Sequence, residues 1–328
     1  MDALGLLESF PCQLGTIPDR PDYVPEALSE SLGLWLLILE TSGHKEKFAS
    51  QVSILRNYFR LLNGTLSWRL QLGQQRETVY VAPYSATIDD MRVIGALLEA
   101  EQKWGIRDYR DLAMQFAQAL KKYALVEDLL MHQTGPSEKD RGPKIVDLSY
   151  LDLPTMTRLG KLDGDWQKVK DRCRQVLKGG MRPTGLFFDK YDVDKKFYYN
   201  AEKNLINSLL CAIHLAEQSS DRDLTILFLK KEWAQRGKIY GRYDPDTGQS
   251  IVPYESVAVY ALAMRLALLL GDMTFAEQMR ARILLLSSGS KGGVWRGSLV
   301  DEGGHSFDHL QALFSLLLYA QHQGRKTS

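Results

Sequence analysis

Carboxylates and aromatic residues gather at one recurring position in this sequence, just before or within the first turn of each apolar helical segment. The clusters are Ser29-Glu30, Asp89-Asp90, Tyr150 with Asp152, Tyr199-Asn200 with Glu202, Tyr254-Glu255, and His305 with Asp308. Hydrolysis of a glycosidic bond needs a protonated carboxyl beside the leaving oxygen and a second carboxylate that activates water or attacks carbon. Aromatic faces hold sugar rings. The clusters therefore indicate carbohydrate chemistry, provided that the fold brings them together.

Two kinds of helical segment alternate along the chain, and this alternation predicts how the clusters meet. Six segments are apolar nearly all round: Ala27–Leu39, Asp89–Trp104, Leu153–Leu159, Ala201–Ala216, Ser256–Leu270 and Phe307–Ala320. Five amphipathic segments lie between them, and Leu4–Ser9 could supply a sixth: Lys45–Leu62, Tyr109–Tyr123, Trp166–Leu177, Leu224–Gln235 and Phe275–Leu286. A helix that is apolar all round belongs in an inner layer, and a half-charged helix belongs outside it. Strict alternation makes the inner helices parallel, so their N-termini converge on one mouth.

The architecture that fits this order is a closed double ring of helices. An open helical solenoid would need a consensus repeated at a fixed period, and the sequence has none. Strand signals are few, at Glu77–Val81 and in a short run at Gly185–Phe188, while Gln133–Lys144 and Tyr243–Pro253 are typical of rim loops. We therefore expect one all-α domain over residues 1–328, an (α/α)6 barrel.

The composition excludes several classes of function. Lysine and arginine number 41 against 40 acidic residues, and the net charge of +1 argues against nucleic acid or an acidic membrane surface as a partner. Cys12, Cys173 and Cys211 are too few and too far apart for a disulfide framework, so we expect free thiols, the last two on helices. The six histidines lack the HxxxH or HxH spacing of metal ligands, and no phosphate-binding glycine loop occurs. We expect no metal and no cofactor.

No apolar stretch is long enough to span a membrane. The longest, residues 32–39 and 258–270, are short or interrupted by Arg265, and the N-terminus lacks the pattern of a signal peptide. A leader or anchor removed before Met1 would place the protein outside the cell or on its surface, and otherwise it would be cytoplasmic. We expect a monomer that acts on a polysaccharide or oligosaccharide.

Each carboxylate also has a purely structural interpretation. Asp and Glu are favoured in the first turn of any helix, where they accept from free N–H groups and complement the helix dipole. Ser29 has the character of an N-cap residue, and Glu30 behind it could simply start its helix.

Four segments resemble glycoside hydrolase family 8 and the related family 126. Ser29-Glu30-Ser31-Leu32-Gly33-Leu34 is similar to the family opening S-E-G-x-G-Y, and Ala86-Thr87-Ile88-Asp89-Asp90 with Trp104-Gly105 resembles the signature A-[ST]-D-[AG]-D and its helix. Leu148-Ser149-Tyr150-Leu151-Asp152 resembles the segment N-P-S-Y, and His305-Ser306-Phe307-Asp308-His309-Leu310 resembles the closing Y-Y-D-Q-x-L helix. Their order and spacing cover most of the chain.

The resemblance implies an (α/α)6 glycosidase in which Glu30 is the general acid. It also implies that Asp90 contacts sugar in the central subsite, although Ile88 replaces the first Asp of the signature. The family 8 base lies in a Y-D-A-x-R motif, and Asn200 stands in its place here. An amide cannot act as that base. Loss of this Asp while the Glu persists resembles family 126, which implies endo-acting cleavage of α-1,4-glucans.

The sequence does not decide which residue is the second catalytic carboxylate, and the candidates are Asp90, Asp152, Glu202, Glu255 and Asp308. We expect Asp89 to be a helix-start or substrate-binding residue. Candidate sugar platforms, each of which could instead belong to the core, are Tyr84, Tyr150, Tyr199, Tyr254, Trp68 and Trp295, with Asn200, Glu255 and Asp308 as further substrate contacts. Trp104 and Trp166 lie in helical patterns and are expected in the core. A mostly buried Glu30 facing an elongated groove, with Asp90 across from it, would fit an endo-glycosidase. The alternatives are a family 8-like β-1,4-glucanase or chitosanase, and a barrel that binds glycans without cutting them.

Overall fold

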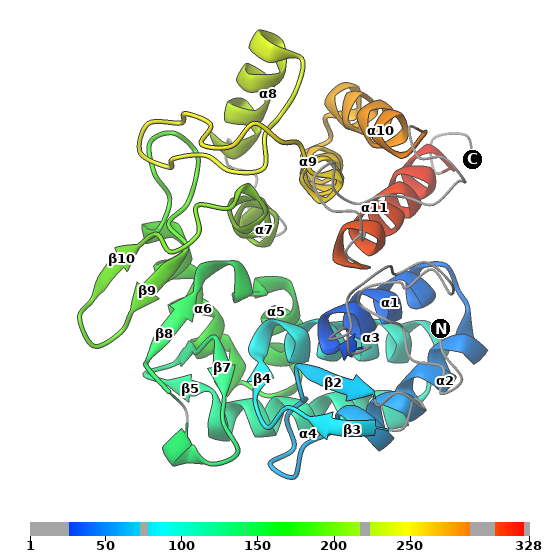
Figure 1. Ribbon diagram of the computed structural model, residues 1–328. Coiled ribbons are helices and arrows are strands. Elements are labelled where there is room, and N and C mark those ends of the chain that lie inside the picture. The colour runs from blue at the N-terminus through cyan, green and yellow to red at the C-terminus, as the bar shows by residue number, and fades with distance from the viewer. Residues whose placement is uncertain (1–25, 73–77, 141, 217–223, 289–305, 325–328) are drawn as a thin grey trace.

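Among the residues described by the computed structural model, 26–72, 78–140, 142–216, 224–288 and 306–324, the main feature is a closed inner ring of helices (Figure 1). The inner helices are α1 (Ser29–Thr41), α3 (Thr87–Trp104), α5 (Leu153–Leu162), α7 (Leu205–Ala216), α9 (Val257–Leu269) and α11 (Ser306–Gly324). Each packs against the next in this order, and α11 packs against α1. The ring confirms the predicted (α/α)6 barrel.

An outer layer covers this ring. Its helices are α2 (Lys45–Ile54), continued by a π-helical turn at Leu55–Phe59, α4 (Arg107–Tyr123), α6 (Asp165–Gly179), α8 (Leu224–Arg236) and α10 (Met273–Ser288). Each outer helix packs on the inner helix that precedes it in the chain. All five predicted amphipathic segments thus lie in the outer layer, whereas Leu4–Ser9 lies outside the described residues.

Burial explains the two layers. Every residue of α9 from Val257 to Met264 is buried, as its all-round apolar sequence requires. The outer helix α4 buries a stripe that includes Leu112, Phe116 and Leu120, four residues apart, and exposes its charged side. Trp166 is fully buried, as predicted, and Trp104 packs edge-on against Phe48 with ring centroids 5.1 Å apart.

Hydrogen bonds near both ends of the barrel join the first inner helix to the last. The hydroxyls of Ser31 and Ser306 lie 2.7 Å apart near one end of the barrel, and Gln321 Nε2 donates to Thr41 O at 3.1 Å near the other. Leu34 and Ile38 of α1 also belong to a hydrophobic cluster with Phe307 and other residues of α11.

Short strands stand beside the starts of inner helices. One sheet has the order β1 (Glu26–Leu28), β2 (Arg69–Leu72), β3 (Thr78–Val81), and another has the order β10 (Phe197–Tyr199), β9 (Lys190–Asp192), β8 (Ile145–Asp147), all pairs antiparallel. Two further strand pairs are β4 (Ser85–Ala86) with β7 (Gln133–Thr134) and β5 (Leu125–Val126) with β6 (Leu129–Leu130). Short 3-10 turns lie at Glu138–Asp140 and Leu148–Tyr150. Because β1 and β4 run directly into α1 and α3, these strands fix where the two helices begin.

The structure differs from the sequence analysis at two of these places. β3 matches the predicted strand at Glu77–Val81, but Gly185–Phe188 has only a single bridge, between Met181 and Phe187. The 190–199 hairpin was not predicted, because its short strands, with Asp192 at the turn end, lack a clear apolar alternation.

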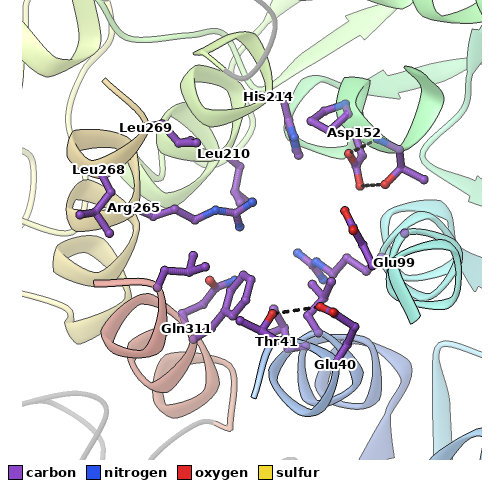
Figure 2. A pocket seen from close by; sticks show the side chains of 18 of the residues that line it. Glu40, Thr41, Glu99, Asp152, Leu210, His214, Arg265, Leu268, Leu269 and Gln311 are labelled. Carbon is purple, nitrogen blue, oxygen red and sulfur yellow. Dashed lines mark hydrogen bonds between the residues drawn. The ribbon is translucent and has the colours of Figure 1, made fainter. Parts of the chain in front are cut away.

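A hollow runs along the centre of the ring, from Ile88 and Asp152 at the starts of α3 and α5 to Glu40, Lys103 and His322 near the ends of α1, α3 and α11. A cavity of about 490 Å³ lies there, and its walls come from all six inner helices (Figure 2). Close contact between α3 and α5 closes part of its wall: a Cβ at Gly95 would lie 2.7 Å from Thr155 Oγ1, so only glycine fits.

Candidate active site

The first turn of α1 is held in place by the neighbouring sheet. Ser29 N donates to Trp68 O at 3.1 Å, and Trp68 N donates to Tyr84 O at 3.0 Å, so three backbone segments lie side by side. The residue in the N-cap position is Leu28, which offers no side-chain cap, and the N-cap role expected of Ser29 was therefore wrong. Glu30 follows at the N-terminal end of the ring, with 28% of its side chain exposed, so it is less buried than expected.

Two buried side chains of α3, those of Asp89 and Arg92, form a linked group beside Glu30. Arg92 Nη1 lies 3.5 Å from Glu30 Oε1 and 3.0 Å from Asp89 Oδ1, so one guanidinium joins the two carboxylates. Ser29 Oγ donates to Asp89 Oδ2 at 2.7 Å. The helix-start serine thus serves the neighbouring helix, and it ties α1 to α3 directly behind Glu30.

Burial raises the pKa of Asp89 to about 7, against the opposing effect of the Arg92 guanidinium, and the charge of Glu30 adds to the rise. Burial also raises the pKa of the Tyr150 hydroxyl, with the charges of Asp147, Asp89 and Glu30 contributing. These electrostatic interactions bring Tyr150, which precedes α5, into the same group as Glu30 and Asp89. The mouth therefore gathers polar residues from α1, α3 and the start of α5.

Asp90 lies in a different environment from the one expected. Its side chain is fully buried, Leu66 N donates to Oδ1 at 3.0 Å, and Ser85 Oγ donates to Oδ2. Burial raises the pKa of Asp90 to about 8. Both contacts tie α3 to the 66–85 segment, as expected of a carboxylate that positions other groups. They do not place Asp90 across the mouth from Glu30.

Exposed aromatic rings stand next to this mouth. Trp68 and Tyr84, neighbours through their backbones, are 36% and 42% exposed, and Arg69 lies over the Trp68 ring at 4.6 Å. Tyr199 and Tyr254 are half-buried, and Tyr199 packs against the exposed ring of Phe197 with centroids 5.4 Å apart. Trp295 lies outside the described residues.

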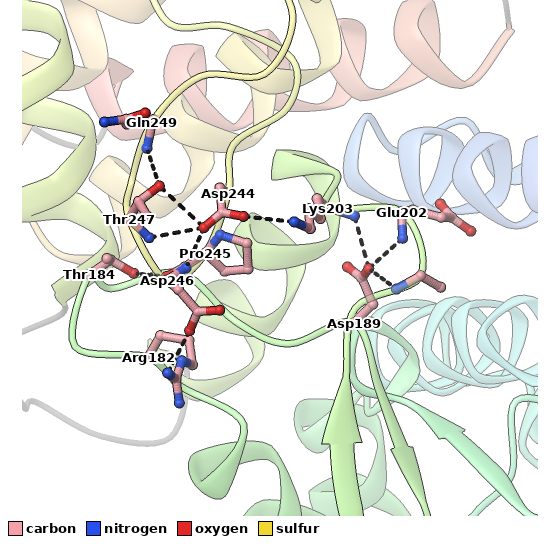
Figure 3. A network of polar contacts seen from close by, with 11 residues as sticks. Arg182, Thr184, Asp189, Glu202, Lys203, Asp244, Pro245, Asp246, Thr247 and Gln249 are labelled. Atoms are coloured by element: carbon pink, nitrogen blue, oxygen red, sulfur yellow. Dashed lines mark hydrogen bonds and ion pairs between the residues drawn. The ribbon is translucent and has the colours of Figure 1, made fainter.

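A second polar network holds the loop before α7 (Figure 3). Asp189 Oδ2 accepts from the backbone N–H groups of Ala201, Glu202 and Lys203 at 2.8, 2.7 and 2.9 Å. Lys203 Nζ reaches Asp244 Oδ2 at 2.7 Å, which ties this loop to the 243–253 loop. Asn200 sits at the start of the loop, and its buried Oδ1 has no hydrogen-bond partner among the residues that the structure describes.

The other candidate carboxylates are engaged in holding helices. Glu255 is buried and accepts two bonds from Arg282, at 2.8 and 2.5 Å, while Asp308 Oδ1 accepts from Ser256 Oγ and Ala258 N at 2.9 and 3.1 Å. Asp152 caps α5 by accepting from Thr155 N at 3.0 Å. Glu202 is exposed.

Sequence reasoning missed two residues of this region, Arg92 and Asp189. The position of Arg92, three residues after Asp89 on a helix, was a visible signal for that ion pair, but its contact with Glu30 crosses from α3 to α1. Asp189 gives no local signal, since its three donors follow 12 to 14 residues later.

Within the described ranges no group of three or more metal-ligating side chains occurs, and no helix is long and apolar enough to cross a membrane. Cys173 on α6 and Cys211 on α7 are buried free thiols, as predicted, and Cys12 lies outside the described residues.

Comparison with known proteins places this geometry among carbohydrate-active barrels. No protein-family model matches the sequence. "Putative lipoprotein YdaJ" of Bacillus subtilis (strain 168) is 33% identical over 250 residues, which are 75% of this chain and 65% of that protein. The chain thus spans about two thirds of the length of this curated relative.

Solved structures show the same architecture. A novel alpha-amylase from Clostridium perfringens matches with a TM-score of 0.80 and 27% identity, covering 90% of this chain and 86% of that one. PssZ from Listeria monocytogenes matches with a TM-score of 0.76 and 20% identity over 96% and 91% of the two chains. A cold-adapted family 8 xylanase matches with a TM-score of 0.71 and 13% identity over 96% and 82%. The chain therefore has the (α/α)6 barrel fold of these structures, which include an alpha-amylase and a family 8 xylanase.

Proposed function

We propose that this chain is a glycoside hydrolase, a single barrel domain that cuts a polysaccharide within its length, with Glu30 as general acid. The observation that carries the proposal is the position of Glu30. It is a partly exposed carboxyl in the first turn of α1, at the mouth where the inner helices begin, backed by Asp89 and Arg92. A carboxyl placed beside a leaving oxygen can give it a proton in the transition state.

The exposed rings beside the mouth support a sugar chain as the substrate. Trp68 and Tyr84 offer open aromatic faces next to the start of α1, and Tyr199 with Phe197 offers a second aromatic surface on the β9–β10 hairpin. Aromatic side chains in more than one place suit a sugar chain that extends in both directions beyond the bond that is cleaved.

An α-1,4-glucan is the substrate we propose. The likeness to a protein described as an alpha-amylase, at 27% identity over most of both chains, supports this choice. Asn200 supports it as well, because it occupies the position of the family 8 base and thereby resembles family 126. The name of the Bacillus relative, a lipoprotein, supports a location outside the cell or on its surface, and we propose that the protein acts there as a monomer.

We propose Asp90 as the first candidate for the second catalytic carboxylate. The buried position of Asp90 and its contacts with Leu66 N and Ser85 Oγ favour a positioning role over direct activation of water.

One observation favours a second function, a barrel that binds glycans without cutting them. The amide of Asn200 cannot act as a base, and its buried Oδ1 leaves an acceptor open among the described residues. A sugar hydroxyl could satisfy this acceptor without any bond cleavage.

A substrate panel tests the proposal. The protein is incubated with soluble amylose, carboxymethylcellulose and chitosan, and both reducing ends and viscosity are followed. An endo-acting α-glucanase lowers the viscosity of amylose early, before many reducing ends appear. Cleavage of carboxymethylcellulose or chitosan instead would favour the β-1,4-glucanase alternative. Binding without cleavage of any polymer would favour the non-catalytic barrel.

A further inference from the structure

One guanidinium lies between two carboxyl groups at the mouth of the barrel. Arg92 Nη1 is 3.0 Å from Asp89 Oδ1 and 3.5 Å from Glu30 Oε1, and both Arg92 and Asp89 are buried. One cation can balance one carboxylate. If both carboxyls ionise, the group carries a net negative charge in a place where burial disfavours charge. The contacts therefore suit two carboxyls that hold one proton between them.

The packing of α1 on α3 positions the guanidinium. Gly33 lies one turn after Glu30 on α1, and a Cβ at this position would be 3.2 Å from Arg92 Cβ and 3.8 Å from Arg92 Cδ. Because position 33 has no side chain, the aliphatic part of Arg92 can lie against α1 on its way to the Glu30 carboxyl. A glycine in the first inner helix thus helps to place the cation of the second.

Ser29 can form a hydrogen bond with Asp89 in both charge states of the carboxyl. The serine hydroxyl lies 2.7 Å from Asp89 Oδ2 and 3.4 Å from Trp68 O. When Asp89 is ionised, the hydroxyl donates to the carboxylate. When Asp89 is protonated, its O–H can donate to Ser29 Oγ while the serine O–H turns to Trp68 O, because a hydroxyl both donates and accepts. The site is therefore built for a carboxyl that gains and loses a proton.

The electrostatics of Asp89 agree with a shared proton. Burial raises the pKa of Asp89 to about 7, the Arg92 guanidinium opposes the rise, and the charge of Glu30 adds to it. Two carboxyls that interact strongly lose their protons in two steps that belong to the pair. Arg92 balances the charge left by the first step, whereas the second step has to add an unbalanced charge to a buried group.

The other titratable groups near the first turns of α1 and α3 have contacts of their own. They are Asp90 with Leu66 N and Ser85 Oγ, Asp152 with Thr155 N, Asp147 with Lys190, Glu26 with Arg69, and Asp308 with Ser256 Oγ and Ala258 N, together with His309 of α11 and Tyr150. Burial and the charges of Asp147, Asp89 and Glu30 raise the pKa of the Tyr150 hydroxyl. Tyr150 therefore stays neutral while the pair titrates.

We propose that Glu30 and Asp89 share one proton, with Arg92 as their common counter-charge, and that Asp89 is the positioning residue that keeps this proton available to Glu30. The inference rests on the proposed function, in which Glu30 is the general acid. A sugar chain that covers the partly exposed Glu30 removes water from it, which favours its neutral form.

The proton then changes place within the pair. The O–H bond of Asp89 breaks, an O–H bond forms on Glu30 through solvent water, and Asp89 is left as a carboxylate paired with Arg92. Glu30 gives this proton to the leaving oxygen, and a proton from the water that hydrolyses the bond restores the pair.

Carbon-13 NMR of the side-chain carboxyls, from about pH 3 to about pH 9, tests the pair without any substrate. In the intact protein the Asp89 signal is expected to change with a midpoint at about pH 7. Glu30→Gln removes the partner charge and should lower this midpoint by about one unit or more. Asp90→Asn identifies the separate signal of Asp90, whose pKa burial raises to about 8. An Asp89 midpoint near the ordinary value of 3.8, or one that Glu30→Gln leaves unchanged, overturns the proposal.

The pH dependence of kcat/KM on the cleaved polymer tests the use of the proton. In Asp89→Asn a single carboxyl stands beside Arg92, so the alkaline limb of the profile should move to lower pH by about one unit or more. A purely structural loss would lower kcat/KM at every pH and leave this limb in place, and that result would overturn the role of Asp89.

Asp147→Asn is the matched control. Asp147 is also a buried carboxylate that accepts from a serine hydroxyl, that of Ser149 at 2.7 Å, and pairs with a cation, that of Lys190 at 2.8 Å. This variant should leave the Asp89 midpoint and the alkaline limb unchanged. Equal shifts in Asp147→Asn would show that loss of any buried carboxylate has this effect, and would overturn the pairing.

Failure of the pair and failure of the proposed function give different results. The Glu30→Gln titration needs no change at Asp89, so it decides on the pair even if Asp89→Asn does not fold. A protein that shows the coupled titration but cleaves no polymer would keep the pair and refute the proposed function, and with it the catalytic use of the proton. A protein that cleaves polymer while Asp89 titrates independently would keep the function and refute the pair.

Discussion

Replacing Glu30 by glutamine separates proton donation from a helix-start role. The amide is nearly isosteric and still accepts a bond from Arg92, but it cannot deliver a proton. General acid catalysis contributes about 10²–10⁴-fold to rate, so turnover of the cleaved polymer should fall by about that factor while glycan binding persists. A role in starting α1 predicts full turnover instead.

The effect on stability should be small, and the structure shows why. The Glu30 side chain is 28% exposed and its ion pair with Arg92 is long, 3.5 Å. A first-turn charge contributes about 0.3–1 kcal/mol, and exposed ion pairs contribute a similar amount. For a protein of this size such a loss lowers Tm by less than about 4 °C.

Glu26 provides the matched control. It lies four residues earlier, on β1, with 20% of its side chain exposed and Arg69 at 3.4 Å, so Glu26→Gln removes a comparable ion pair away from the first turn of α1. Initial rates and melting curves are measured on both variants, together with an aryl glycoside whose leaving group needs no proton. Glu30→Gln should recover activity on the aryl glycoside. Near-normal turnover of Glu30→Gln on every polymer that the wild type cleaves, or an equal loss in Glu26→Gln, would refute the assignment.

Three further predictions rest on other parts of the structure. Burial raises the pKa of Asp90 from 3.8 to about 8, so the native state keeps a proton that the unfolded chain loses above about pH 4. Stability should therefore fall as the pH rises from about 4 to about 8, and urea midpoints of Asp90→Asn should fall less steeply over that window; parallel profiles would contradict the buried, protonated state. Trp68→Ala should raise KM about two- to tenfold with little change in kcat, whereas an unchanged KM would show that this ring is no sugar platform. Asp189→Ala should cost about 2–3 kcal/mol in urea unfolding, because three N–H groups lose a charged acceptor, while the exposed pair of Asp246 with Arg182 makes Asp246→Asn cost under about 1 kcal/mol; equal costs would argue against the Asp189 network.

The layers could be predicted from sequence because the buried face of a helix appears as a periodic pattern of apolar residues. A segment such as Val257–Leu269, apolar on every side, can only lie inside, and the charged face of Arg107–Tyr123 can only lie outside. The parallel direction of the inner helices follows from their alternation with outer ones. The place of Glu30 at the mouth follows in turn.

The contacts of the candidate site could not be predicted in the same way. Asp89 and Asp90 are adjacent in the sequence, yet one carboxyl bonds Ser29 and Arg92 and the other bonds Leu66 N and Ser85 Oγ. Neighbouring residues on a helix point about 100° apart, so their surroundings depend on the elements that pack there. Glu255 shows the same limit, since its partner Arg282 comes from α10.

The joint between α1 and α11 has a consequence for synthesis of the protein. The serine pair that links them, Ser31 and Ser306, spans 275 positions of sequence. At about 5–20 residues per second, a ribosome needs roughly 15–55 s to pass from one to the other. Throughout that time Leu34 and Ile38 on the emerging α1 lack the aromatic side chains of α11 that will cover them. The nascent chain is therefore an incomplete ring with an exposed apolar edge, which chaperones and neighbouring nascent chains can contact until the last inner helix leaves the ribosome.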